Sequence, residues 1–332
     1  MTGRIAVVTG GAGFIGSHMV DLLLERGYRV RVVDSLAGGR EGNLAQHAGD
    51  PRLTFDRRDI RAVSPGDPIF EAATFVFHFA GIGDIVPSIE RPAEYMDVNV
   101  QGTVRVLEAA RAAKVAKVVY AASSSCYGLA EVPTREDHAI RPEHPYALSK
   151  YAGELAVLHW NRVYGLPANS IRIFNAYGPR VRTSGAYGAV FGVFFRQKLA
   201  GQPFTVVGDG TQRRDFVYVT DVADAFARAS ESPLSGQIWN LGAGHPRSVR
   251  ELVELIGGPM ELIPRRPGEP DATWADTGKI RRDLGWSPAV TFEEGVGRMM
   301  ADIDHWRDAP LWDPASIAAA TATWFRYLGV NG

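Results

Sequence analysis

The segment Thr9–Gly16, with the sequence TGGAGFIG, decides the fold of this chain. It follows the apolar run 4–9 and precedes a helical pattern over residues 14–26. Glycine allows a tight turn between the two, and it lets backbone N–H groups and the start of the helix face a pyrophosphate. The spacing is G-x-x-G-x-x-G, which departs from the six-residue G-x-G-x-x-G fingerprint of dinucleotide-binding folds. The context still predicts a phosphate-binding turn made by Gly10, Gly13, Phe14, Ile15 and Gly16.

Asp34 ends the next apolar run, which starts at Arg29. A carboxylate in this place accepts hydrogen bonds from the ribose hydroxyls of a bound dinucleotide. The same charge repels a 2′-phosphate, so the sequence favours NAD over NADP. Arg40 would suit NADP, but we interpret it as a solvated loop residue.

The first half of the chain alternates short β-branched runs with longer helical patterns. Strands are predicted over 4–9, 29–34, 75–79 and 117–122, and helices over 14–26, 92–113 and 145–164. This rhythm predicts an α/β fold of the Rossmann type, a doubly wound parallel sheet with helices on both faces. Beyond residue 178 the pattern is less regular, although 216–219 and 237–241 still resemble sheet strands. We expect an NAD-binding domain over 1–178 with returning segments near 215–245, and a smaller C-terminal α/β domain over 179–332 that mainly binds substrate.

Composition excludes several classes of protein. The 332 residues carry a formal net charge of −1, so no basic excess points to nucleic acid or an anionic membrane as a partner. The single cysteine, Cys126, excludes an internal disulfide framework and fits a reducing compartment, so we expect a cytoplasmic protein. No window approaches the roughly 18 apolar residues of a membrane span, and the histidines lack ligand-like spacing, so we expect neither a membrane nor a metal.

Tyr146 and Lys150 lie four residues apart in the predicted helix 145–164, so both side chains leave the same face. A free tyrosine titrates near ~10. A neighbouring cation and a positive nicotinamide ring favour the phenolate, which makes Tyr146 a candidate general base. The serine run 123–125 follows a predicted strand, at the edge where open α/β sheets bind ligands. Each pattern is common, and their joint occurrence after the glycine turn is what indicates a catalytic site.

The order of the motifs TGGAGFIG, SSSCYG, YALSK and GDGTQRRDFVYVTD resembles the extended short-chain dehydrogenases/reductases that act on nucleotide sugars. The resemblance extends over residues 3–290 and implies an NAD-dependent nucleotide-sugar epimerase. It implies Ser123, Tyr146 and Lys150 as catalytic residues, with Ser123 chosen because it lies four residues before Tyr127. Besides the glycine turn, Asp34, Tyr146 and Lys150, it implies cofactor contacts from Asp59, Ile60, Phe79, Ala80, Gly81, Asn99, Ala121 and Tyr177.

The same resemblance implies the nucleotide-sugar half of the site. The segment FNAYGPR at 174–180 matches the family pattern RxxNxYGP, whose Asn meets the substrate phosphates or sugar. Arg214 and Arg266 would clamp the substrate diphosphate, because a planar guanidinium donates hydrogen bonds to two phosphate oxygens at once. A strand at 204–207 would lie along the nucleotide base of the substrate. Glu269 would accept hydrogen bonds from the hydroxyl groups of the substrate ribose. The substrate-binding residues implied are Ser124, Ser125, Asn175, Arg182, Phe204, Val206, Arg214, Arg266 and Glu269.

The serine run also bears on the reaction. Related sugar dehydratases carry Asp-Glu or a lone Glu where this chain has Ser124 and Ser125. A neutral serine does not readily abstract the required proton, so dehydration is disfavoured. The resemblance implies epimerisation at C4 of UDP-glucose and UDP-galactose through a 4-keto sugar, with NAD taking and returning the hydride. A UDP-glucuronate or UDP-N-acetylhexosamine 4-epimerase, an NDP-sugar dehydratase and a 4-ketoreductase are the alternatives, and Arg182 or Arg180 would admit a uronate carboxylate.

The sequence also bears on the oligomeric state of the protein and on whether it is an enzyme at all. The resemblance implies a homodimer formed through the predicted helices 92–113 and 145–164. A monomer whose aromatic C-terminal segment covers that surface is the alternative. A dinucleotide sensor without chemistry is a further alternative, and the intact Tyr146 and Lys150 argue against it.

Overall fold

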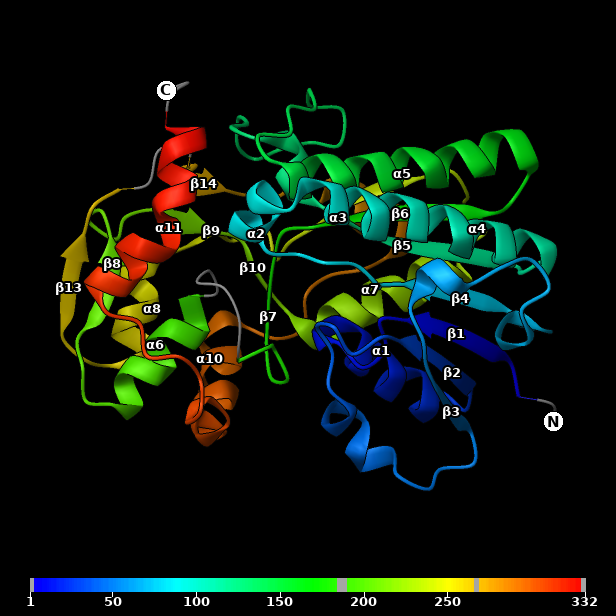
Figure 1. The fold of residues 1–332 in the computed structure, drawn as a ribbon, viewed down its shortest axis with the longest axis horizontal. Coiled ribbons are helices and arrows are strands. Elements are labelled where there is room, and N and C mark those ends of the chain that lie inside the picture. The colour runs from blue at the N-terminus through cyan, green and yellow to red at the C-terminus, as the bar shows by residue number, and fades with distance from the viewer. Residues whose placement is uncertain (1–2, 184–189, 266–268, 330–332) are drawn as a thin grey trace.

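The computed structural model describes residues 3–183, 190–265 and 269–329. Its centre is a seven-stranded parallel sheet in the order β11-β6-β5-β4-β1-β2-β3 (Figure 1). The strands are β1 (Ile5–Thr9), β2 (Arg29–Asp34), β3 (Leu53–Arg57), β4 (Phe75–His78), β5 (Lys117–Ser123), β6 (Ala168–Ile173) and β11 (Ile238–Leu241). All strands run the same way, but successive strands are added outward from β1 on one side and from β4 on the other. Ligands bind at the carboxyl ends of the strands at such a switch point. The predicted Rossmann-type fold is confirmed.

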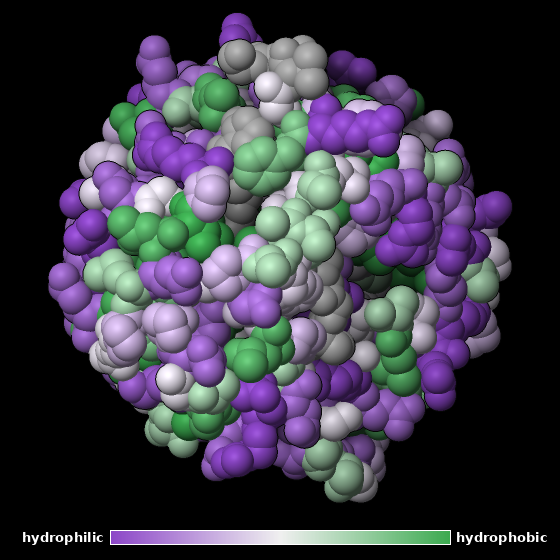
Figure 2. All heavy atoms as spheres, turned by 60° about the vertical axis from the view of Figure 1, so that its left-hand side comes forward, coloured by the Kyte–Doolittle hydropathy of each residue, from purple (hydrophilic) through white to green (hydrophobic). Residues whose placement is uncertain are grey.

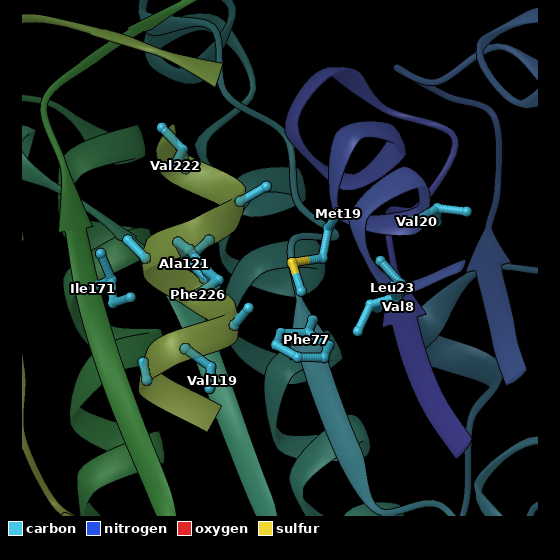
Figure 3. Packing of buried hydrophobic residues seen from close by; sticks show 14 of the residues in the cluster. Val8, Met19, Val20, Leu23, Phe77, Val119, Ala121, Ile171, Val222 and Phe226 are labelled. Carbon is cyan, nitrogen blue, oxygen red and sulfur yellow. The ribbon is translucent and has the colours of Figure 1, made fainter. Parts of the chain in front are cut away.

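Helices cover both faces of the sheet. On one face lie α1 (Phe14–Glu25) and α7 (Val219–Glu231), and on the other lie α4 (Gly102–Ala112) and α5 (Pro145–Tyr164) (Figure 1). Successive strand residues point to opposite faces, so Val8 packs under α1 while Val7 belongs to the cluster under α4. Figure 3 shows the first cluster, in which Phe226 of α7 and Met19 of α1 pack over the sheet.

The predicted single helix over 92–113 is interrupted. The structure has α3 (Pro92–Met96), a π-helical segment (Asp97–Gln101) and then α4. The extra residue per turn rotates Asn99 out of the α-helical register, and its buried amide then reaches the loop after β4. Such π segments are frequent at functional sites.

The C-terminal part has its own aromatic core around Tyr177, Phe191, Phe216 and Trp306. Its helices are α6 (Val190–Leu199), α8 (Val249–Ile256), α9 (Gly278–Leu284) and α10 (Phe292–Ala301). Short sheets accompany them: β8 (Phe204–Val207) with β13 (Met260–Ile263), β7 (Asn175–Tyr177) with β10 (Phe216–Tyr218), and β9 (Arg213–Arg214) between β12 (Arg247–Ser248) and β14 (Ala272–Thr273).

The aromatic C-terminal segment docks onto the body. Helix α11 (Pro314–Leu328) packs against α2 (Ile85–Glu90), and the Thr323 hydroxyl donates a 3.0 Å hydrogen bond to Glu90. Upstream, Trp306 lies in the aromatic core beside Phe195. This side of the molecule intersperses hydrophilic with hydrophobic residues (Figure 2). In the described ranges, no helix combines the length and the hydrophobicity of a membrane span.

Candidate active site

The glycine turn is built by close backbone contacts. Gly10 has φ +71°, and a Cβ there would lie 2.6 Å from the Ala80 nitrogen. A Cβ on Gly16 would lie 2.1 Å from the Gly10 carbonyl oxygen, so a larger residue at either position would displace the turn. Helix α1 begins after Gly13 with no side-chain cap from the described residues, which leaves first-turn N–H groups facing the turn. This cradle fits a pyrophosphate.

Asp34 lies directly beside that turn. Its carboxylate accepts hydrogen bonds from the backbone N–H groups of Ala12, at 2.9 Å, and Leu36, at 2.8 Å. Burial raises the pKa of this carboxyl, and the two backbone donors oppose the shift. Each carboxylate oxygen keeps a further lone pair, so Asp34 can fix the turn and also accept from ribose hydroxyls.

The residues predicted to flank adenine follow β3. The Asp59 carboxylate is held by Arg61, whose Nη2 lies 2.7 Å from Asp59 Oδ2 and whose Nη1 lies 2.5 Å from Asp97. Ile60 is buried against α4, where a Cβ on Gly102 would lie 2.6 Å from Ile60 Cδ1. The structure thus places Asp59 in an ion pair and the Ile60 side chain in the core.

The loop after β4 is fixed by Asn99. Its amide oxygen accepts from the Ile82 N–H at 2.9 Å, and its amide nitrogen donates to the Ile82 carbonyl and to Ser149 Oγ. Gly81 lies beneath this amide, because a Cβ there would be 2.9 Å from Asn99 Oδ1 and 3.9 Å from Lys150 Nζ. Asn99 therefore positions the 79–82 loop against Lys150. Phe79 packs its ring on Phe226, with 4.6 Å between centroids.

A buried chain of hydrogen bonds runs under this loop. His78 joins Thr9 Oγ1, at 2.6 Å, to Thr103 Oγ1, at 2.9 Å, and Thr103 donates to the Asn99 carbonyl. Burial lowers the pKa of His78 to about 3, so its ring is neutral near pH 7. Thr103 belongs to no sequence motif and was not predicted to lie at the site.

The three predicted catalytic residues come together at the carboxyl end of β5. Ser123 ends β5 and hydrogen-bonds the phenol of Tyr146, and Lys150 lies one turn along α5. Burial raises the pKa of Tyr146, the Ser123 hydrogen bond lowers it, and the negative charge of Asp84 raises it further. Burial lowers the pKa of Lys150 to about 7, and its ammonium lies 4.4 Å from the centre of the Tyr120 ring.

The structure alters one electrostatic expectation. In the protein itself burial dominates the pKa of Tyr146, so the adjacent lysine does not suffice to make the phenol acidic. The positive charge of an oxidised nicotinamide ring is then the influence that favours the phenolate. Two rings hold the phenol in place: His144 stacks on Tyr146 at 5.9 Å, and Tyr95 meets it edge-on at 6.5 Å.

The remaining residues of this edge have distinct placements. Ala121 is buried in β5, and Ser124 and Ser125 lie half-buried in the single turn after it. The Ser125 N–H donates to Ser123 Oγ at 3.2 Å, so the serine run caps its own turn.

A cavity of about 200 Å³ adjoins this edge in the C-terminal part. Arg214 and Glu269, both predicted to bind substrate, line it and form an ion pair with 2.7 Å between Nη2 and Oε1. Asn175 also lines it and accepts a 2.8 Å hydrogen bond from Thr273. Arg266, the second predicted clamp, lies outside the described residues.

A known protein family matches more than half of this chain. The model of the NAD dependent epimerase/dehydratase family matches residues 6–242. The chain belongs to this family. The sequence-based assignment to NAD-dependent nucleotide-sugar enzymes is confirmed, and the cofactor of this epimerase/dehydratase family member is NAD.

Individual relatives resemble the chain over most of their length. It is 38% identical over 301 residues to a UDP-glucose 4-epimerase of Mycolicibacterium smegmatis, which covers 88% of this chain and 96% of the relative. The solved UDP-glucose 4-epimerase of Thermotoga maritima with UDP-glucose has a TM-score of 0.81 and 32% identity, over 92% of this chain and 99% of that one. The solved UDP-glucuronic acid 4-epimerase of Bacillus cereus with UDP-glucuronic acid and NAD has a TM-score of 0.84 and 30% identity, over 91% of this chain and 99% of that one.

The structure corrects the predicted base-binding strand of this epimerase/dehydratase family member. Phe204 and Val206 are buried in the aromatic core, whereas Thr205 and Val207 of the same strand line the cavity. Because side chains alternate along a strand, only the main chain of Phe204 and Val206 is left for the predicted contact with the nucleotide base. The alternation itself was the available signal.

The resemblance implies that Tyr177 approaches the nicotinamide through its backbone. Its backbone lines the cavity, but its ring stacks on Phe191 with 5.0 Å between centroids, and its hydroxyl approaches the Phe292 carbonyl. Gly178 follows, and a Cβ there would lie 3.7 Å from the Phe14 ring. The main chain of 177–178 therefore faces the glycine turn, while the tyrosine side chain belongs to the core.

Arg182 has a partner that the sequence did not reveal. Its Nη2 lies 2.5 Å from Oδ2 of Asp84, in the loop between β4 and α2. The guanidinium predicted to face substrate is therefore already paired with a carboxylate in the protein.

Proposed function

We propose that this protein interconverts the C4 epimers of a nucleoside-diphosphate hexose, with UDP-glucose and UDP-galactose as the best-supported pair. One observation carries the proposal: the Tyr146 phenol, hydrogen-bonded to Ser123, lies at the same carboxyl edge of the parallel sheet as the glycine turn, and the cavity lined by Asn175 and Arg214 begins just after β6 at that edge. The 38% identity to a UDP-glucose 4-epimerase supports this substrate pair. A uronate or an N-acetylhexosamine in place of the hexose is the alternative that the test below separates.

In the proposed mechanism Tyr146 removes the proton of the C4 hydroxyl and later returns it, while Ser123 orients that hydroxyl. NAD, held by the glycine turn and Asp34, would supply a reversible hydride acceptor for C4 of a sugar that turns between the two transfers. Arg214 holds the diphosphate, so that the hexose turns while its nucleotide stays fixed. Lys150 contributes positive charge beside the loop 79–82.

We propose a division of labour along the chain. Residues 1–178, with returning segments near 215–245, bind NAD, and residues 179–332 mainly bind substrate. Two contacts support it: β11 pairs with β6 in the central sheet, and α7 packs against α1.

We also propose that the protein is a cytoplasmic homodimer. A buried Cys126, whose pKa burial raises to about 12, fits a reducing compartment. Leu148 and Leu155 are exposed on the outer face of α5, which supports a helix-mediated dimer.

The test is incubation of the purified protein with UDP-, GDP-, dTDP- and CDP-hexoses and catalytic NAD, followed by NMR of the products. We expect UDP-glucose and UDP-galactose to interconvert with no net reduction of NAD. Accumulation of a 4-keto sugar, stoichiometric consumption of reduced cofactor, or inertness across the panel would contradict the proposal.

A further inference from the structure

The ion pair between Asp84 and Arg182 joins two loops that belong to different halves of the site. Asp84 lies between β4 and α2 in the cofactor-binding half, and Arg182 follows the FNAYGPR segment that borders the substrate cavity. The two residues are 98 positions apart in the sequence, and each side chain is about one-third exposed, 34% for Arg182 and 38% for Asp84. The pair is therefore partly open to solvent.

Asp84 is also adjacent to the catalytic phenol. Its carbonyl accepts a 2.7 Å hydrogen bond from the Tyr95 hydroxyl, and the Tyr95 ring packs edge-on against Tyr146. Its negative charge raises the pKa of Tyr146, so its field reaches the phenolic oxygen.

The chemistry of the sugar makes this position informative. In a hexose, C4 and C6 are both bonded to C5, so a C4 hydroxyl at Tyr146 places the C6 substituent among the groups that surround that phenol. A neutral hexose carries a hydroxymethyl group there, whereas a uronate carries a carboxylate. A carboxylate binds well to an unpaired guanidinium and is repelled by a neighbouring carboxylate.

We propose that Asp84 is a specificity residue, which neutralises Arg182 and so makes the site select a neutral hexose over a uronate. This inference rests on the proposed function. Asp84 lies outside the segments SSSCYG and YALSK, which contain the proposed catalytic residues.

The experiment compares kcat/KM for UDP-glucose and UDP-glucuronate in the wild type and in Asp84→Asn. The substitution keeps the shape of the side chain and removes its charge, so Arg182 becomes free to bind the uronate. We expect the ratio of kcat/KM for UDP-glucuronate to that for UDP-glucose to rise about tenfold or more, the gain from one charge-assisted hydrogen bond.

Two further variants decide the cause. The double variant Asp84→Asn with Arg182→Gln should show no gain, because the gain needs the guanidinium. Glu94→Gln removes an equal charge from a surface pair with Arg91 on the adjoining helix and should leave the ratio unchanged.

A merely structural latch would lower turnover of both substrates together in Asp84→Asn, with an unchanged ratio, and that outcome overturns the inference. A gain that survives in the double variant also overturns it. Failure of the wild type to epimerise any neutral hexose would instead contradict the proposed function, so the two failures are distinguishable.

Discussion

The acidity of a single phenol controls the proposed chemistry. Replacing Tyr146 with Phe removes the proton acceptor but keeps the ring that packs between His144 and Tyr95. We expect turnover to fall by about 10²–10⁴-fold, the usual contribution of a positioned acid–base group, with bound NAD retained. Progress curves measured by NMR and the NAD content of the purified variant check this. Undiminished turnover would show that another residue is the base.

Ser123 should act through the same phenol. Its hydrogen bond lowers the pKa of Tyr146, so Ser123→Ala leaves burial and Asp84 to raise that pKa further. The base works when deprotonated, so the acidic limb of the kcat profile should move to higher pH, by about one unit for one lost hydrogen bond to a charged group. His144 and Cys126 titrate outside this range, with pKa values of about 4 and about 12. Lys150, with a pKa of about 7, is present in both proteins, so the shift is measured between the wild type and the variant.

The plateau at high pH supplies the control for Ser123→Ala. If the hydroxyl acts on the pKa, kcat recovers part of its value as the phenol ionises. If kcat of the variant is lower by the same factor at every pH and its acidic limb stays at the wild-type pH, Ser123 has a different role.

At the scale of elements, local patterns predicted what depends on neighbours in the sequence. The glycine turn and α5 follow from spacing, and α5 has the predicted bounds of 145–164. The strand β3 was not predicted, because LTFDR is short and mostly half-exposed. Phe204 and Val206 were assigned to the cavity by resemblance, although the alternation along β8 directs them into the core.

Pairs that are distant in the sequence were beyond prediction for a physical reason. Arg182 meets Asp84 and Arg214 meets Glu269 because separate loops converge in space, and no spacing rule relates such positions. The sequence therefore identified charged candidates near the site but not which charges neutralise one another. That distinction bears on the choice between a neutral hexose and a uronate, as we propose for Asp84 and Arg182.

The contact between α5 and β6 contains a further ion pair, which is buried. Glu154 of α5 and Arg172 of β6 are 1% and 3% exposed, with 2.6 Å between Oε1 and Nη2, and Ser170 also donates to the carboxylate. Glu154→Gln leaves a buried guanidinium without its counter-ion, so we expect the free energy of unfolding to fall by about 3–5 kcal/mol. Urea titration followed by circular dichroism measures it.

A surface pair gives the matched control for Glu154→Gln. Glu294 and Arg298 of α10 are 49% and 48% exposed, so Glu294→Gln should change the free energy of unfolding by less than about 1 kcal/mol. Equal effects of the two substitutions would show that the buried pair adds no more stability than a solvated one.

At the scale of the whole molecule, the C-terminal segment joins the two halves. Trp306 packs in the substrate-side core, the Trp312 carbonyl accepts a 2.7 Å hydrogen bond from Gln197 of α6, and α11 then reaches α2. Because α2 directly follows the loop that carries Asp84, the segment braces the site from outside. The sequence left open a C-terminal segment that covers the surface of α5. Among the described residues, Leu148 and Leu155 of α5 remain exposed although α11 is docked.

That exposed face leads to the prediction about assembly. Leu148 and Leu155 lie seven residues apart on α5, and so on one side of the helix, with 44% and 49% of their surface exposed. A homodimer through this face would bury both, and a charge placed there would lose its hydration without gaining a partner. We therefore expect Leu155→Glu to sediment as a monomer and the wild type as a dimer. Leu255→Glu, at a 40% exposed leucine of α8 in the substrate half, should remain dimeric. A wild type that sediments as a monomer, or a Leu155→Glu variant that remains a dimer, would place the interface elsewhere or remove it.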